Sequence, residues 1–164
     1  ELQRAGFASS ELEKRVLQLF SEQRPAVLRS VRAADAIALA FDESFQGDRV
    51  AAFVVGLRDM QSDAYGGEGG FYLHHEFDPQ KLYHLARNLE IASWRLRQNR
   101  RPDNQLFLLS IGADQQGVFN TSFERLFGKM IGVHDQFAHV IADTTSRRIK
   151  NVVQGVASAV FFPI

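Results

Sequence analysis

The chain has 164 residues, of which 19 are basic and 19 acidic, and it contains no cysteine. Its length suits a single domain with its own buried core, and the lack of cysteine excludes disulfides, thiol nucleophiles and cysteine-ligated metals. The balanced charge gives no electrostatic reason to expect nucleic acid or an anionic membrane as the partner.

Three helices are predicted in the first part of the chain. Ser10 and Glu13 form a capping box, which predicts that a helix begins at Ser10. Pro25 separates this helix from a second apolar stripe at helical spacing over residues 28–45. Asp48 is then a plausible N-cap, so we expect a third helix to follow it.

A glycine-rich stretch, residues 66–70, follows the third helix and is interpreted as a flexible joint. A phosphate-binding loop is the alternative, but the stretch follows a predicted helix and matches no phosphate-binding motif. Asp78 and Pro79 form a strong helix start, because the aspartate caps free amides and proline suits the first helical position. The fourth helix is expected to turn one apolar set inward: Leu82, Leu85, Ala86, Leu89, Ala92 and Leu96.

A long helical element is predicted over residues 120–164, opened by a capping box of Thr121 and Glu124. The cap-forming residues 143–146 favour a break into two antiparallel helices, with one continuous curved helix as the alternative. The first half carries an apolar stripe at steps of three and four: Phe123, Leu126, Phe127, Met130, Val133, Phe137, Val140 and Ile141.

The apolar segment 152–164 has two interpretations. We expect it to dock as a helix into the protein's own core, with Phe161 and Phe162 filling gaps, because an exposed apolar segment would aggregate. Insertion into a partner groove or a membrane interface is the other interpretation. Together these elements predict an all-α fold, a bundle or orthogonal array of about five to seven helices in one domain spanning 1–164.

Four residues near the glycine joint are candidate metal ligands. A divalent ion can be held by imidazole nitrogens and a carboxylate, but their spacing matches no established ligand pattern. An exposed turn and a solvated helix face explain the same residues without a metal. The candidates are His74, His75, Glu76 and His84.

One face of the fourth helix is the best candidate for a partner-binding surface. It combines tryptophan, tyrosine and arginine, which are the residue types enriched at interface hot spots. An ordinary amphipathic helix whose arginines cover Trp94 is the competing interpretation. The candidate residues are Tyr83, Arg87, Trp94, Arg97 and Arg101.

The leading functional hypothesis is a non-enzymatic helical interaction domain that binds a protein partner or a second copy of itself. We expect no catalytic residue, cofactor or nucleic acid, and do not favour membrane contact through 152–164. The first residue is Glu1 and not methionine, so we expect a processed or trimmed amino terminus. The soluble part of a bacterial envelope protein is the expected setting, and a periplasmic or envelope-associated location is favoured over a cytoplasmic one. The alternative is a small-molecule or metal-binding protein, or an enzyme, that uses the histidine-rich segment.

Overall fold

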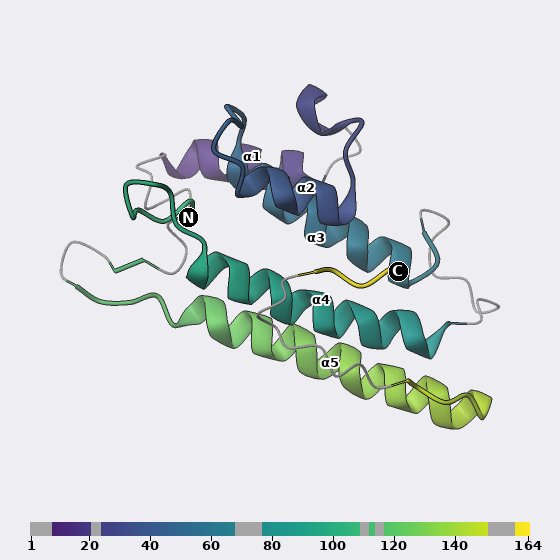
Figure 1. Cartoon of the computed structure of the whole chain (residues 1–164). Coiled ribbons are helices and arrows are strands. Elements are labelled where there is room, and N and C mark those ends of the chain that lie inside the picture. Colours follow the sequence, from purple (N-terminus) through teal and green to yellow (C-terminus); the bar gives the residue numbers. More distant parts are fainter. Residues whose placement is uncertain (1–7, 21–23, 68–76, 109–111, 114–116, 151–159) are drawn as a thin grey trace. The chain divides into compact units, whose positions relative to one another are not determined.

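The computed structural model describes residues 8–20, 24–67, 77–108, 112–113, 117–150 and 160–164. These ranges hold five α-helices and no strand, which confirms the predicted all-α class (Figure 1). Two isolated antiparallel bridges join Arg100 to Leu106 and Ala113 to Phe119. The helices are α1 (Ser9–Phe20), α2 (Ala33–Ala40), α3 (Arg49–Ala64), α4 (Pro79–Gln98) and α5 (Ser122–Thr145), with a 3₁₀ turn η1 (Ala26–Leu28).

The helices belong to two compact units, each made from two stretches of chain. Unit 1 comprises Glu1–Arg58 and Leu96–Thr121, and unit 2 comprises Asp59–Arg95 and Ser122–Ile164. The single domain spanning 1–164 stays a prediction.

The start signals predicted for α3, α4 and α5 coincide with the observed helix starts, whereas α1 begins at Ser9, so Ser10 lies inside that helix and not at its N-cap. The backbone N–H of Ala51 donates to Oδ1 of Asp48 over 3.0 Å, so Asp48 caps α3 as predicted. The N–H of Gln80 donates to Oδ1 of Asp78 over 2.9 Å at the start of α4. Thr121 directly precedes the first residue of α5.

The stripe predicted over residues 28–45 is not one helix. It is divided into η1, α2 and a non-helical loop after Ala40. The Arg49 guanidinium donates to the carbonyls of Ala40 and Phe45 over 3.1 and 2.9 Å, and to that of Asp42. Because a distant side chain satisfies these carbonyls, the loop needs no helical hydrogen bonds.

Unit 1 depends on close packing of α2 against α3. A Cβ atom on Gly56 would lie 2.6 Å from Cγ1 of Ile37 and 2.7 Å from the carbonyl oxygen of Ala33. Beside this contact, the ring of Phe41 meets those of Phe53 and Phe107 edge-on, with centroids 5.9 and 6.1 Å apart. Glycine at position 56 is therefore what lets the two helices approach.

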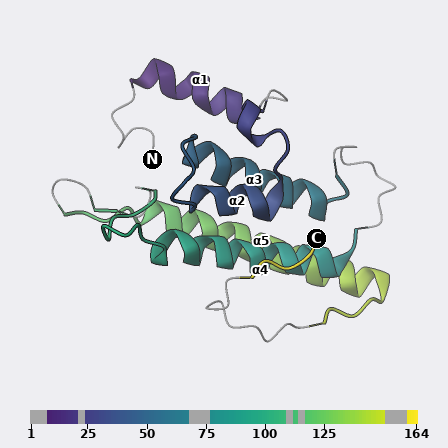
Figure 2. The ribbon, with the colours of Figure 1, turned by 45° about the horizontal axis from the view of Figure 1, so that its top comes forward.

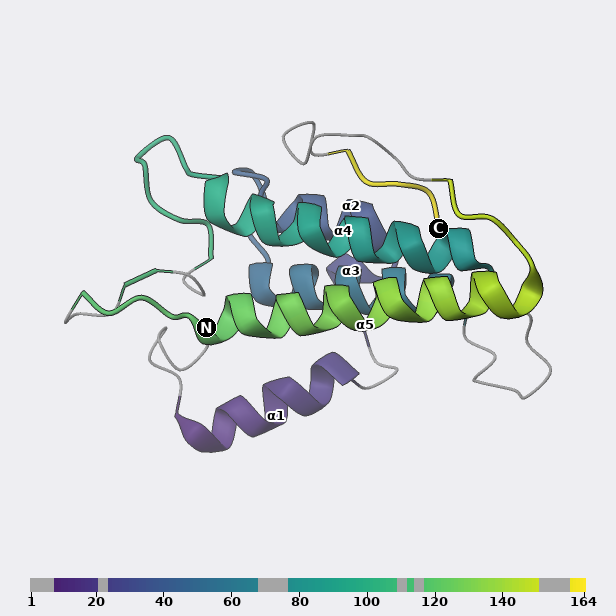
Figure 3. The ribbon, with the colours of Figure 1, turned by 90° about the horizontal axis from the view of Figure 1, so that it is seen from below.

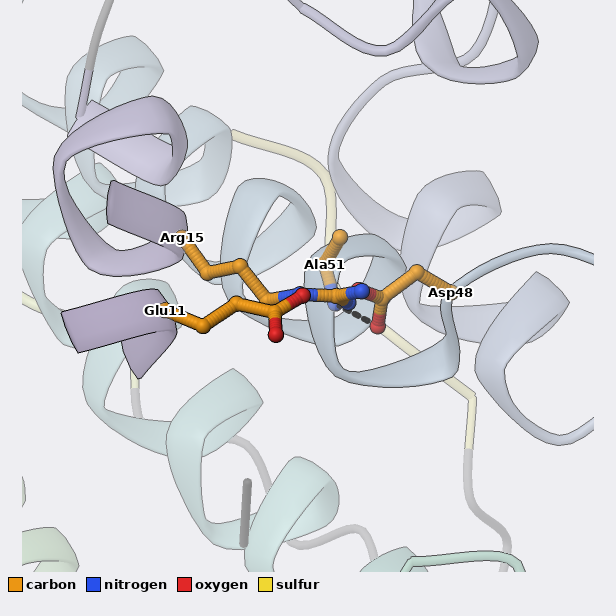
Figure 4. Close-up of polar contacts among 4 residues, drawn as sticks. All are labelled: Glu11, Arg15, Asp48 and Ala51. Carbon is orange, nitrogen blue, oxygen red and sulfur yellow. Dashed lines mark hydrogen bonds and ion pairs between the residues drawn. The ribbon is translucent and has the colours of Figure 1, made fainter. Parts of the chain in front are cut away.

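Arg15 connects α1 to the start of α3 (Figure 4). Its Nη1 lies 3.0 Å from Oδ2 of Asp48, and its Nε lies 3.7 Å from Oε1 of Glu11. Oδ1 of the same Asp48 carboxylate caps α3. Since these side chains are partly exposed, we expect the ion pairs to contribute at most about 1 kcal/mol each.

In unit 2, α4 and α5 lie side by side (Figures 2 and 3). Leu82 and Tyr83 on α4 form a buried cluster with Ala138 on α5. The whole inward set predicted for α4, Leu82 to Leu96, is buried as expected. Partly buried apolar side chains pack against the cluster: Tyr65, Phe77, Phe137, Ile141 and Ile149.

Helix α5 ends at Thr145, and residues 147–150 are not helical, so the predicted break is observed and a single rod is excluded. The buried positions of α5 are Phe127, His134, Ala138 and Ala142. The predicted stripe is wider than this buried face, because Leu126, Val133 and Val140 are 56%, 62% and 49% exposed.

Residues 160–164 are not helical and run along α4 (Figure 3). The helix predicted within 152–164 thus does not include these residues, and residues 151–159 lie outside the described ranges. Phe161 and Phe162 nevertheless contact α4, as the docking interpretation expects. None of the helices in the described ranges combines the length and low polarity that crossing a membrane requires.

Candidate functional site

The predicted partner-binding residues are distributed over both units. In unit 2, Tyr83 is buried beneath the guanidinium of Arg87, 5.0 Å from its ring centroid, and Trp94 is half-buried. In unit 1, Arg97 and Arg101 are exposed, and the guanidinium of Arg101 lies 5.7 Å from the Phe107 ring. Their role in binding a partner stays a prediction.

Of the candidate metal ligands, His74, His75 and Glu76 lie outside the described residues. His84 is described, and both of its ring nitrogens have hydrogen-bond partners. Within the described ranges, no three histidine, aspartate or glutamate side chains are grouped closely enough to hold a metal. The metal site stays a prediction.

Arg87 on α4 pairs with two carboxylates, of which Asp135 joins α4 to α5 and Glu90 lies on α4 itself. Its Nη2 pairs with Oδ2 of Asp135 and lies 3.2 Å from Oε1 of Glu90. Burial raises the pKa of Glu90, and the neighbouring Arg87 opposes this effect. Two buried atoms of the pair, Nε of Arg87 and Oδ1 of Asp135, have no hydrogen-bond partner among the described residues. This is the arrangement of a helix-joining ion pair.

A second polar pair in unit 2 joins Tyr65 to His134. The Tyr65 hydroxyl and Nδ1 of His134 share a hydrogen bond of 2.9 Å. Burial lowers the pKa of His134 and raises that of Tyr65, so both groups are held neutral near pH 7. Such a pair can move a proton, but none of the contacts described for it includes a nucleophile.

A cavity with a volume of about 520 Å³ belongs to unit 1. Its wall holds two arginines, Arg49 and Arg101, and two acidic residues, Glu43 and Asp103. The charges balance, and Arg49 uses its donors on backbone carbonyls. The cavity wall therefore favours no class of ligand by its charge.

Unlike the cavity wall, a row of polar side chains on α4 binds polypeptide backbone. Asn88 is fully buried, and its Nδ2 donates to the carbonyl oxygen of Phe162 over 3.0 Å. The N–H of the same Phe162 donates back to Oδ1 of Asn88 over 2.7 Å. One side-chain amide thus satisfies both backbone groups of one residue.

Gln80, two turns earlier on the same face, repeats this pairing. The N–H of Lys150 donates to Oε1 of Gln80 over 2.7 Å, and Nε2 of Gln80 donates to the Lys150 carbonyl over 3.2 Å. We call Gln80, His84, Asn88 and Arg95 the α4 row. Positions four and seven apart share a helix face, so the four side chains follow one line along α4.

His84 lies between the two amides and has a defined proton position. Its Nδ1 lies 2.8 Å from the carbonyl oxygen of Pro163, which can only accept, so Nδ1 donates. Its Nε2 lies 2.8 Å from Nε2 of Gln80, which can only donate, so Nε2 accepts. With the proton on Nδ1, His84 completes the hydrogen bonds that link it to Gln80 and to Pro163.

Two members of the row also hold the aromatic rings of the bound segment. The His84 imidazole stacks on the Phe162 ring, with centroids 5.2 Å apart and an interplanar angle of 27°. The Arg95 guanidinium lies 4.4 Å from the centroid of the Phe161 ring. Arg95 is half-buried, and this burial lowers the pKa of its guanidinium.

Sequence reasoning found only His84 of this row and assigned it to a metal. The row lies about 100° around α4 from the predicted partner-binding face, by the helical repeat. One signal was available. Asn88 stands among the inward residues Leu85, Leu89 and Ala92, and an asparagine in such a position needs a hydrogen-bond partner.

Comparison with models of known protein families, with curated proteins and with solved structures finds no match for the chain.

Proposed function

We propose that the protein is a non-enzymatic helical interaction domain whose α4 row holds an extended polypeptide segment. The observation that carries this proposal is the paired hydrogen bonding of Asn88 with the N–H and carbonyl of Phe162. The two groups of one residue point to the same side only in extended backbone, so a side-chain amide recognises extended chain of any sequence. Gln80 makes the same pair with Lys150.

The segment bound to the row belongs to the chain itself. A partner segment must therefore compete with residues 160–164 for the row. A segment tethered to the same chain acts at an effective concentration in the millimolar range. A partner segment gains access when its own affinity exceeds that of residues 160–164. The bacterial envelope setting expected from the sequence stays a prediction.

The test uses the full 164-residue chain with Phe162→Pro, which removes both the N–H that donates to Asn88 and the ring that stacks on His84. A fluorescently labelled peptide with the sequence VFFPI, capped at both ends, is titrated and followed by anisotropy. We expect binding to this variant and none to the wild type, whose row is already occupied.

Two matched controls identify the binding site. Adding Asn88→Ala to the variant removes the amide and should weaken binding about 5- to 150-fold, as expected for about 1–3 kcal/mol per unsatisfied buried group. A peptide N-methylated at its second phenylalanine should lose a similar factor. If the variant is not helical by circular dichroism, Phe162→Ala replaces it. Absence of binding to a folded variant, or binding that ignores Asn88, rejects the proposed function.

A further inference from the structure

The α4 row contacts the side chains of its segment as well as the backbone, and these contacts restrict the sequence that fits. Arg95 contacts residue 161, Asn88 contacts residue 162 and His84 contacts the carbonyl of residue 163. The segment therefore runs antiparallel to α4, because its successive residues 161 to 163 contact row members in the reverse order of the helix.

Position 163 favours proline. A proline restricts the residue before it to extended backbone, which is the conformation that lets Phe162 present both backbone groups to Asn88. Proline also lacks an N–H, and the contact described at Pro163 uses only its carbonyl oxygen. A segment with proline here loses less conformational entropy when it binds.

Position 162 favours an aromatic ring. His84 is held by Gln80 and by the Pro163 carbonyl, so the plane of its imidazole is fixed. The Phe162 ring stacks on that plane at 27°. An aromatic side chain gains more from such stacking than an aliphatic one of similar size.

Position 161 favours an aromatic ring with an electron-rich face. The Arg95 guanidinium lies 4.4 Å from the Phe161 centroid, within the range of a cation–π contact. Arg95 is half-buried, and a desolvated cation gains more from the ring than an exposed one. Tryptophan has the strongest cation–π attraction of the aromatic residues, so phenylalanine is not the best residue for this position.

We infer that the ligand of the α4 row is an extended segment of another protein in which two aromatic residues precede a proline, with tryptophan the best first aromatic. This inference rests on the proposed function. A second copy of this chain is a poor competitor, because its identical segment gains no contact and lacks the advantage of the tether. A partner segment with tryptophan in the first position can exceed the resident affinity.

The test measures four capped peptides, VWFPI, VFFPI, VLFPI and VFFAI, against the Phe162→Pro chain by anisotropy. We expect VWFPI to bind about 3- to 10-fold more tightly than VFFPI, and VLFPI about 3- to 10-fold more weakly. VFFAI should bind about 2- to 5-fold more weakly, because its backbone is less restricted. Affinities within twofold across all four peptides would overturn the inference while leaving the proposed function intact.

The matched protein control is Arg95→Met in the same chain, since methionine keeps apolar length without the charge. It should abolish the preference for tryptophan over leucine and leave the preference for proline over alanine unchanged. If none of the four peptides binds to the folded variant, the proposed function itself fails. Light scattering of the variant mixed with wild type tests whether a second copy of this chain occupies the row. A mixed dimer would overturn the assignment to another protein.

Discussion

Asn88 is buried in the core and also binds the backbone of Phe162. Its neighbours along the inward face are leucine and alanine, and a buried amide among them costs free energy unless it is hydrogen-bonded. The backbone of Phe162 supplies a donor and an acceptor, so the cost is offset. The sequence could identify Asn88 as exceptional, but its partner lies 74 residues away in the chain and no local pattern identifies it.

His134 gives the first prediction at the residue scale, which concerns pH. Burial lowers the pKa of His134 in the folded state, while Asp135 opposes this in part. The unfolded chain therefore takes up the proton more readily, with a pKa near 6.5. The sign follows from linkage: stability is complete above about pH 6.5 and falls as the pH decreases toward the lower folded-state pKa.

Urea unfolding at pH 7.5 and pH 5.5 measures this effect. His134→Gln keeps a hydrogen-bonding partner for Tyr65 but does not titrate, so it should lose less stability between the two pH values than the wild type. His139→Gln, at an exposed position of the same helix, is the matched control and should behave as the wild type does. An equal loss in wild type and His134→Gln would contradict the account of this pair.

At the scale of elements, the start signals were predictable because they are local. Asp48 and Asp78 cap α3 and α4, and both positions follow from residues within one turn of the helix start. The end of α2 was not predictable, because Arg49 in α3 satisfies the carbonyl of Ala40, the last residue of α2. The width of the α5 stripe was also misleading, since apolar spacing does not distinguish Val133 from Phe127.

Two helical glycines give a matched pair of substitutions. Gly56→Ala should destabilise the protein by about 1–3 kcal/mol, because its Cβ would meet the backbone of α2 at Ala33 and Ile37. Gly128→Ala on α5 meets no atom within 4 Å, so helix propensity should stabilise it by up to about 1 kcal/mol. Both values come from urea unfolding. Equal effects of the two substitutions would contradict the close packing of α2 on α3.

At the scale of the whole molecule, composition and periodicity were enough for the all-α class, because both are properties of the entire chain. The candidate site was not accessible in the same way. The α4 row is defined by pairs between α4 and residues 150 and 160–164, which only the folded chain brings together. The sequence predicted that Phe161 and Phe162 dock, but not that they dock on α4.

The measurement that tests the central claim most directly is hydrogen exchange of the backbone amides of Phe162 and Lys150 by NMR. In the wild type we expect the Phe162 amide to exchange at least about tenfold more slowly than in an unstructured peptide, as for an opening free energy of about 1.4 kcal/mol. Asn88→Ala should release Phe162 alone, and Gln80→Ala should release Lys150 alone. A Phe162 amide that exchanges at the unstructured rate in the wild type would contradict the account.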